Sequence, residues 1–284
     1  VINITMAKRK FYGTKKEMID VWNDSKQKHI WVKGTIGAGD FMSGLNVAYF
    51  RSFVLEIPIQ VEFHWYHDED YQFHMEDPES VIEKFDYLHQ FYYQKGTDVT
   101  STHVFNSTDK DLYKKRYRHH RGVIKTNDYR CWSFNTDMLR VVTIPKKIVL
   151  WRQTFNAAAP RSFKRAFDND GWNYIVKSLQ DQGYHVVEID YRTPIREVMY
   201  HISNCEATVG YEGMWHMVAK NFWKPMIIFT KDNITNLHTP NAYIFAKSMK
   251  KDFDWKILDD FPKVLAGAKS KINRIYKRLI LRGK

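Results

Sequence analysis

EATVGYEGMWHMVAKNFWKPMIIF, residues 206–229, contains the pattern of a strand, a tight turn, a short helix and a buried strand. The first apolar run ends near Gly210, a helix-like segment extends to about Lys220, and Met226 opens a second run that ends at Phe229. Runs of this length with glycine between them are typical of strands joined by a helix, which places them in a parallel sheet. We therefore expect an α/β fold.

The residues just before this stretch repeat the alternation. A helix lined by Trp172, Ile175, Val176 and Leu179 is expected to end at Gly183, and YHVVEID follows as a strand. Thr193 and Pro194 are suited to the N-cap and first position of the next helix. Its apolar residues recur at helical spacing: Ile195, Val198, Met199 and Ile202.

The N-terminal half shows the same order. HIWVKG and IQVEFHW are expected strands, FMSGLNVAYFRS is an expected helix between them, and DPESVIEKFDYLHQFYY is a further helix capped by Asp77. A proline-containing connection at Pro145 separates the halves. We expect an N-terminal domain over residues 1–144, a C-terminal domain over 145–262, and a basic amphipathic helix over 263–284 that packs across the domains.

Composition limits the function classes. The 284-residue chain carries 44 Lys and Arg against 32 Asp and Glu, a formal charge of +12, which favours an anionic partner such as nucleic acid, an anionic membrane or a nucleotide. Two cysteines, Cys131 and Cys205, exclude a disulfide framework and a cysteine-based zinc site. No apolar run is long enough to span a membrane, so we expect a soluble protein of the cytoplasm, the host cytoplasm if the protein is viral.

Two glycine turns are candidates for chemistry. In the first, WVKGTIGAGDF (residues 31–41), the Lys-Ser/Thr pair of a phosphate-binding loop is replaced by Asp40 and Phe41. Asp40 is then either a general base for an acceptor hydroxyl or a helix cap. The second turn contains Glu212, which is placed to accept hydrogen bonds from ribose, and Gly213, which lets a diphosphate approach helix amides. Alternatively, Glu212 is a surface acid and His216 a half-buried core residue.

These two turns resemble the signature motifs of two-domain GT-B glycosyltransferases, especially the heptosyltransferase-like group. The resemblance rests on residues 34–50 and 211–229, and on the strand KIVLWR that opens the second half. It implies two Rossmann-like domains facing a central cleft, with a nucleotide sugar such as a UDP-sugar as donor and no cofactor or metal required. It also implies an inverting, metal-independent reaction that transfers a hexose or a pentose.

The resemblance also assigns roles to residues. Asp40 is the implied catalytic base, in an acceptor loop with Gly37 and Gly39. The implied donor-binding residues are Arg152, Tyr211, Glu212, Gly213, Met214 and His216, assisted by Lys164 or Arg165. The family pattern has Asp or Ser where this chain has Tyr211 and Glu212, so the donor sugar stays open.

Residues 110–130 suggest the acceptor. This run holds eight Lys or Arg with Tyr113, Tyr117 and Tyr129 between them, a composition suited to phosphate contacts and base stacking. Short basic chains of this kind resemble bacteriophage glycosyltransferases that modify hydroxymethylated bases in double-stranded DNA. The candidate DNA-binding residues are Lys114, Lys115, Arg116, Arg118 and Arg121. Such an enzyme would extrude the hydroxymethylated pyrimidine toward Asp40.

Two other functions fit the sequence. The same catalytic residues could act on a lipid-linked or lipopolysaccharide acceptor, with the basic C-terminal helix on a membrane. Alternatively, the chain is a non-catalytic nucleic-acid-binding protein in which Asp40 and Glu212 are helix caps. We interpret the segment HWYHDEDYQFH as an acceptor-facing loop and not as a metal site, although it contains the possible metal ligands His64, His67, Asp68, Asp70 and His74. The sequence leaves the oligomeric state open.

Overall fold

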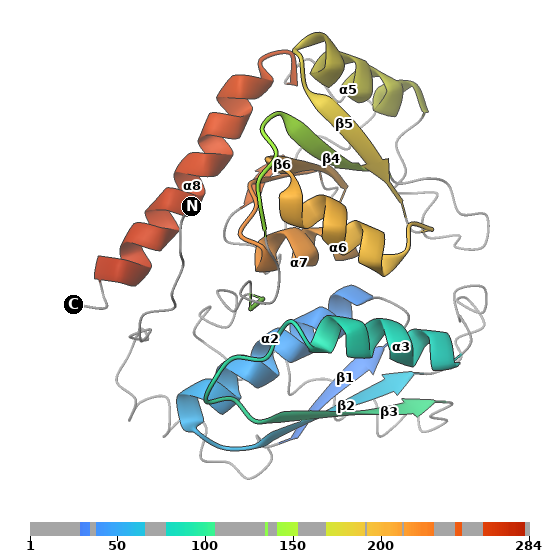
Figure 1. The fold of residues 1–284 in the computed structure, drawn as a ribbon, viewed down its shortest axis with the longest axis vertical. Helices are drawn as coiled ribbons and strands as arrows, with labels where there is room; N and C mark the ends of the chain where they lie inside the picture. The colour runs from blue at the N-terminus through green and yellow to red at the C-terminus, as the bar shows by residue number, and fades with distance from the viewer. Residues whose placement is uncertain are drawn as a thin grey trace.

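The structure is a computed structural model of the 284-residue chain. It describes residues 29–34, 38–65, 78–105, 134–135, 141–152, 169–190, 192–211, 213–229, 242–245 and 258–281. These residues form two α/β units with separate sheets (Figure 1).

The N-terminal unit is a parallel sheet in the order β1-β2-β3, formed by β1 (His29–Gly34), β2 (Ile59–Trp65) and β3 (Val99–Phe105). Helices α2 (Ala38–Leu55) and α3 (Pro78–His89) connect these strands. Along β2, Ile59, Val61 and Phe63 are buried while Gln60 and Glu62 between them are half-buried. This alternation of period two orients the apolar face of the strand toward the helices.

The C-terminal unit is a five-stranded parallel sheet in the order β5-β4-β6-β7-β8. Its strands are β4 (Lys147–Trp151), β5 (His185–Ile189), β6 (Ala207–Tyr211), β7 (Met226–Phe229) and β8 (Ala242–Phe245). Every residue of β4, β6 and β7 is buried. Both faces of these central strands are therefore covered, which explains why most of their residues are apolar.

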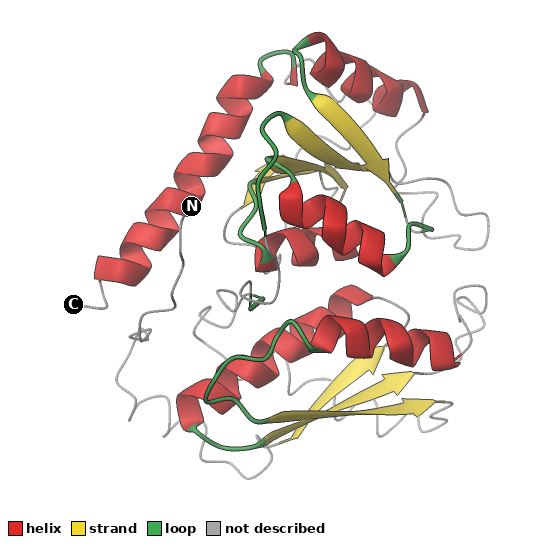
Figure 2. Cartoon of the chain, in the orientation of Figure 1, coloured by secondary structure: helices red, strands yellow, loops and turns green. Residues whose placement is uncertain are grey.

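Helices cover the two faces of this second sheet. Helices α6 (Ile195–Asn204) and α7 (Met214–Asn221) share an apolar cluster with Val149, Trp151 and Ile228. Helices α5 (Asn169–Asp181) and α8 (Phe261–Leu281) share a second cluster with Leu150, Val209 and other alternate strand residues. The unit is thus doubly wound, with helices on both faces (Figure 2).

The α/β fold and most elements predicted from the sequence are confirmed. Gly183 follows α5 with φ 80°, the left-handed conformation expected for a helix-ending glycine. Strands β3 and β8 were not predicted. The predicted role of Thr193 was wrong, because its hydroxyl accepts the Asp190 N–H at 2.9 Å and Pro194 is the N-cap of α6. Thr193 closes the turn after β5 instead.

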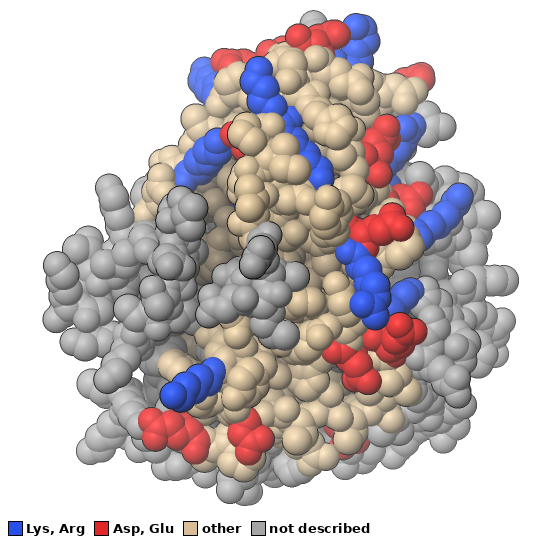
Figure 3. Space-filling view, viewed as in Figure 1, with Lys and Arg blue, Asp and Glu red and all other residues tan. Residues whose placement is uncertain are grey.

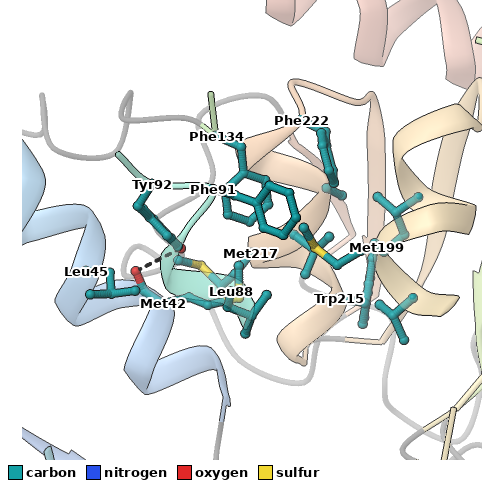
Figure 4. Packing of buried hydrophobic residues seen from close by; sticks show 14 of the residues in the cluster. Met42, Leu45, Leu88, Phe91, Tyr92, Phe134, Met199, Trp215, Met217 and Phe222 are labelled. Carbon is teal, nitrogen blue, oxygen red and sulfur yellow. Dashed lines mark hydrogen bonds between the residues drawn. The ribbon is translucent and has the colours of Figure 1, made fainter. Parts of the chain in front are cut away.

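The two units meet through their helices. In Figure 1, α2 and α3 lie above the first sheet and face α6 and α7, which lie below the second. One apolar cluster runs through this layer, and Figure 4 labels ten of its members: Met42, Leu45, Leu88, Phe91, Tyr92, Phe134, Met199, Trp215, Met217 and Phe222. Side chains fill the layer between these four helices, and the predicted GT-B arrangement around a cleft stays a prediction.

Residues 134–135 connect the halves through the backbone. The Phe134 N–H donates to the Asn221 carbonyl oxygen at 3.1 Å, and the Asn135 N–H donates to the Phe91 carbonyl oxygen at 2.7 Å. At the exposed rim, Arg196 of α6 lies 3.5 Å from Glu83 of α3. The packed helices are therefore linked at several points.

Helix α8 packs on the second sheet. Phe261, Leu265 and Ala268 are buried in the cluster that faces α5, and Lys269 pairs with Glu206 at 2.6 Å. Gln182, which follows α5, accepts the Phe261 N–H at 3.0 Å and so satisfies a backbone donor at the start of α8. Among the described helices, none is long and apolar enough to cross a lipid bilayer.

Candidate functional site

The order of the strands indicates where a ligand would bind. The connection from β4 through α5 leads to β5 on one side, whereas the connection from β5 through α6 returns past β4 to β6 on the other. The carboxyl ends of β4 and β6 are therefore neighbours from which the chain departs in opposite directions. In open parallel sheets, ligands bind outside the strand ends at such a point. We call these strand ends, with the first turn of α7, the β4–β6 site.

Gly210 allows the two strands of this site to come close. It pairs with Trp151 in the parallel register of β4 and β6. A Cβ atom on Gly210 would lie 2.7 Å from the Trp151 Cβ and 2.8 Å from the Trp151 carbonyl oxygen. No side chain fits there, so glycine is required for this contact.

The first turn of α7 is shaped by Gly213 and two aromatic side chains. The Gly213 N–H donates to His216 Nδ1 at 3.0 Å. Since a backbone N–H can only donate, His216 Nδ1 is the acceptor and the neutral ring carries its proton on Nε2. The Trp215 indole N–H donates to the Tyr211 carbonyl oxygen, which anchors the helix to the end of β6.

This geometry changes which amides a diphosphate would contact. The Gly213 N–H already donates to His216. The N–H groups of Met214 and Trp215 are in the first turn of the helix, so they have no carbonyl acceptor within the helix. The positive end of the helix dipole attracts anions there. A Cβ on Gly213 would be 3.4 Å from both the Trp151 Nε1 and the Trp215 Cδ1, so the Gly213 backbone lies against both indoles.

Arg152 follows β4 but points to the other face of the sheet. Its guanidinium donates to Glu188 Oε2 at 2.9 Å and to Asn173 Oδ1 at 3.1 Å. Asn173 lies on α5, whereas Trp151, the preceding residue, packs on the side of α6 and α7. The structure therefore brings Trp151, Tyr211, Gly213 and His216 together and holds the Arg152 side chain in an ion pair on the α5 side.

Lys224, the lysine before Pro225, lies away from this site. It precedes β7, at the amino end of the strand, and its ammonium group donates to Thr143 Oγ1 at 2.9 Å. It is 6% exposed, and burial lowers its pKa. Lys224 therefore contributes to the packing at the amino ends of the strands, opposite to the β4–β6 site.

Asp40 is in the first turn of α2, as its third residue, and Gly39 precedes it in the same helix. The structure describes the backbone position of Asp40 and not its side chain. The other candidate residues lie outside the described part of the chain: Gly37, Lys114, Lys115, Arg116, Arg118, Arg121, Lys164, Arg165 and Glu212. The roles predicted for them stay predictions.

The described residues do not test two of the predictions: that the reaction needs no metal, and that Lys114, Lys115, Arg116, Arg118 and Arg121 bind DNA. His67, Asp68, Asp70 and His74 lie outside them. Within the part of the chain that the structure describes, no three His, Cys, Asp or Glu side chains come together as metal ligands. On the face shown in Figure 3, the described lysines and arginines are interspersed with acidic side chains and do not gather into one basic patch.

A buried polar network between the two halves was not predicted. Lys220 of α7 donates to Asn46 Oδ1 of α2 at 2.9 Å and to Asn221 Oδ1 at 3.1 Å. Asn221 Nδ2 in turn donates to the Tyr92 hydroxyl at 2.7 Å. The polar residue Asn46, between the apolar residues Leu45 and Val47 of α2, was the sequence signal for this network.

Comparison with known proteins gives a distant structural likeness. The chain is similar to a crystal structure of the dodecameric iron-containing heptosyltransferase TibC in complex with ADP-D-β-D-heptose, with 14% identity and a TM-score of 0.43 over 88% of this chain and 76% of that one. A second structure, the bacterial iron-containing dodecameric glycosyltransferase TibC from enterotoxigenic E. coli H10407, aligns over 87% of this chain and 76% of that one with 13% identity and a TM-score of 0.43. No protein-family model matches the chain, and no curated protein matches it. A likeness of this extent assigns neither a family nor an activity.

Proposed function

We propose that the chain is a nucleotide-sugar-dependent glycosyltransferase. In this proposal the donor diphosphate binds at the β4–β6 site, and Asp40 accepts the proton of the acceptor hydroxyl. One observation carries the proposal. Gly213 and the first turn of α7 lie at the carboxyl ends of β4 and β6, where the chain connections of the second sheet depart in opposite directions. A helix N-terminus approached through glycine is suited to a phosphate group.

The proposed reaction is a single displacement. The acceptor oxygen loses its proton to the Asp40 carboxylate and forms a bond to the anomeric carbon of the donor sugar. The bond between that carbon and the diphosphate oxygen breaks, and its electron pair stays on the diphosphate. The amides of Met214 and Trp215 can stabilise the developing negative charge. Attack from the face opposite the leaving group inverts the anomeric configuration.

Arg152 can assist only by changing partners. Because its guanidinium holds Glu188 and Asn173, a diphosphate would compete with the Glu188 carboxylate for it. Its side chain is 23% exposed, which leaves it accessible to an anion at the strand end. Lys164 and Arg165, as predicted from the sequence, would act from the segment that follows. We therefore expect Arg152→Gln to weaken nucleotide binding less than a change at Gly213.

The acceptor in the first form of the proposal is a hydroxymethylated pyrimidine in double-stranded DNA. This part rests on the basic and aromatic run at residues 110–130, which lies outside the described residues. The alternative acceptor is a lipid-linked sugar or lipopolysaccharide. Both acceptors would present a hydroxyl group to Asp40. Because the chemistry at Asp40 is the same for both, only an experiment distinguishes them.

The test is an acceptor and donor panel. The full chain is incubated with UDP-, GDP- and ADP-linked sugars, together with DNA that contains or lacks hydroxymethylpyrimidine, or with rough lipopolysaccharide. Released nucleosides and lipid A-core fragments are weighed by mass spectrometry. A hexose or pentose mass gain only on modified DNA supports the DNA acceptor, and a gain only on lipopolysaccharide supports the alternative. Binding to DNA without transfer from any donor contradicts the enzyme and supports a binding protein.

Two variants assign the base. Asp40→Asn keeps the size of the side chain and removes the proton acceptor, so transfer should fall by about 10²-fold or more. The matched control is Asp181→Asn, because Asp181 is an exposed residue of α5 that pairs only with Lys177 among the described residues. Unchanged turnover in Asp40→Asn, with the protein folded, would remove Asp40 as the base.

A further inference from the structure

The contact between α2 and α7 joins the helix of the proposed base to the helix of the proposed donor site. Asp40 lies in the first turn of α2, and Asn46 follows it by about 9 Å along the helix axis. Met214 begins α7, and Lys220 follows it by about 9 Å. The hydrogen bond of 2.9 Å between Asn46 Oδ1 and Lys220 Nζ therefore links the two helices at similar distances from their reactive ends.

The surroundings of this contact are fully buried. Asn46 is 1% exposed, Lys220 2%, and Asn221 and Tyr92 are 0% exposed. The Tyr92 hydroxyl accepts from Asn221 Nδ2 at 2.7 Å and donates to the Met42 carbonyl oxygen at 3.3 Å, a bond drawn in Figure 4. Met42 belongs to α2, so the network returns to the helix on which Asn46 lies. It connects α2 and α7 through two separate routes.

Apolar packing alone does not fix the relative position of two helices so closely. The neighbouring side chains include Met42 and Met217, and methionine adapts its shape to small shifts. Hydrogen bonds are directional, and a buried ammonium group that loses an acceptor is strongly disfavoured. Buried polar contacts can therefore select one register of packed helices among several of similar apolar burial.

We propose that Asn46, Lys220, Asn221 and Tyr92 are positioning residues, which set the distance between the base on α2 and the diphosphate site on α7. The inference rests on the proposed glycosyl transfer. A sugar held by its diphosphate must present the anomeric carbon within about 3.5 Å of the attacking oxygen. A small sliding of α2 along α7 would lengthen that approach and leave each binding site intact.

The test replaces the polar contact by an apolar one of similar volume. The double variant Asn46→Leu/Lys220→Met removes both partners together, so no buried ammonium group is left without an acceptor. The rescue variant Asn46→Asp keeps an oxygen for Lys220. It loses no hydrogen bond among the described residues, where Asn46 Nδ2 is buried without a partner.

Three measurements are made on each variant. The first is the turnover number with its donor and acceptor KM, and the second is nucleotide affinity by calorimetry. The third is the spin-label distance distribution between Asp86→Cys on α3 and Glu197→Cys on α6, two exposed positions of the two halves, with Cys131→Ser in the background. The third measurement needs no activity.

We expect the double variant to fold, to bind nucleotide within twofold of the unchanged chain, to show a broader distance distribution, and to lose at least tenfold in turnover number. Asn46→Asp should recover turnover to within about threefold. An unchanged distribution and unchanged turnover in the folded double variant overturn the proposal. A loss of nucleotide affinity in parallel with turnover also overturns it, since the network then only supports α7. If the unchanged chain transfers no sugar while the distribution still broadens, the proposed function fails and the helix contact stands.

Discussion

Gly210 and Trp151 lie opposite each other on β6 and β4, so close that a Cβ atom on Gly210 would be 2.7 Å from the Cβ of Trp151. We expect Gly210→Ala to lower the free energy of unfolding by about 1–3 kcal/mol, because the strands must separate to admit a methyl group. Urea unfolding measures the change. The control is Gly213→Ala, whose Cβ meets ordinary contacts of 3.4 Å and should alter stability by about 0.5 kcal/mol at most. Equal stability of both variants would contradict the close approach.

Gly213→Ala should instead weaken nucleotide binding. A methyl group there would point between the Trp151 and Trp215 indoles, next to the first turn of α7. We expect about a tenfold loss of affinity for a nucleoside diphosphate, equivalent to about 1.4 kcal/mol, measured by calorimetry. The control is Lys263→Ala, at an exposed position of α8 in the same unit. Affinity that is unchanged by Gly213→Ala would place the diphosphate elsewhere.

Cys205 should be unreactive in the folded protein. Its thiol is buried between α6 and β6, and burial raises its pKa to about 12, although Lys224 and Lys147 nearby act in the opposite direction. The reactive thiolate is therefore scarce at neutral pH. In a Cys131→Ser background, we expect iodoacetamide at pH 8 to label the chain only after unfolding in guanidinium, as read by mass spectrometry. Rapid labelling of the native chain would contradict the burial.

Acid should destabilise the N-terminal unit. The His103 ring stacks on Phe63 and Phe85, and His89 contacts Tyr49; burial lowers the pKa of both histidines below 6.5, against the effect of Asp86. Since their folded-state pKa is depressed, the unfolded chain binds more protons below pH 6.5. The stability that the two neutral histidines contribute is fully present above pH 6.5 and is lost as the pH falls toward their folded-state pKa.

The comparison is between urea unfolding at pH 8 and at pH 5.5. Replacing His103 by Phe keeps a ring between Phe63 and Phe85 and removes the titrating group. We expect His103→Phe to lose less stability than the unchanged chain between these two pH values, with similar stability of both at pH 8. An equal loss in both chains would show that His103 does not carry the acid sensitivity.

Phe261 should anchor α8 to the second unit. It is 0% exposed and its ring meets Tyr184 edge-on at a centroid distance of 5.0 Å. Phe261→Ala should lower the free energy of unfolding by about 3–5 kcal/mol in urea titrations. The exposed Lys263 on the same helix is the control, and Lys263→Ala should change it by no more than about 0.5 kcal/mol. If Phe261→Ala changed the free energy of unfolding only slightly, the result would contradict the packing of α8 on the second sheet and favour a helix that is free to bind a membrane surface.

The sequence alone predicted the elements that local patterns specify. The spacing of Ile195, Val198, Met199 and Ile202 predicted α6, and all four are buried in the structure. The apolar run at Met226 predicted β7 with the bounds that the structure gives. Strand β3, with the sequence VTSTHVF, was missed because polar residues interrupt its apolar pattern. Its place in the sheet depends on pairing with β2 and not on its own composition.

Only the tertiary structure decided how these elements meet. Asn46 and Lys220 are 174 residues apart in the chain, and their hydrogen bond exists because α2 packs on α7. The ion pair of Arg152 with Glu188 likewise follows from the pairing of β4 with β5, which moves the guanidinium to the α5 side. Local periodicity fixes which face of a helix or strand is apolar, whereas the partner of each face depends on strand order and helix packing. The sequence therefore determined most of the α/β elements and the glycine turn before α7, and the packing decided which side chains surround that turn.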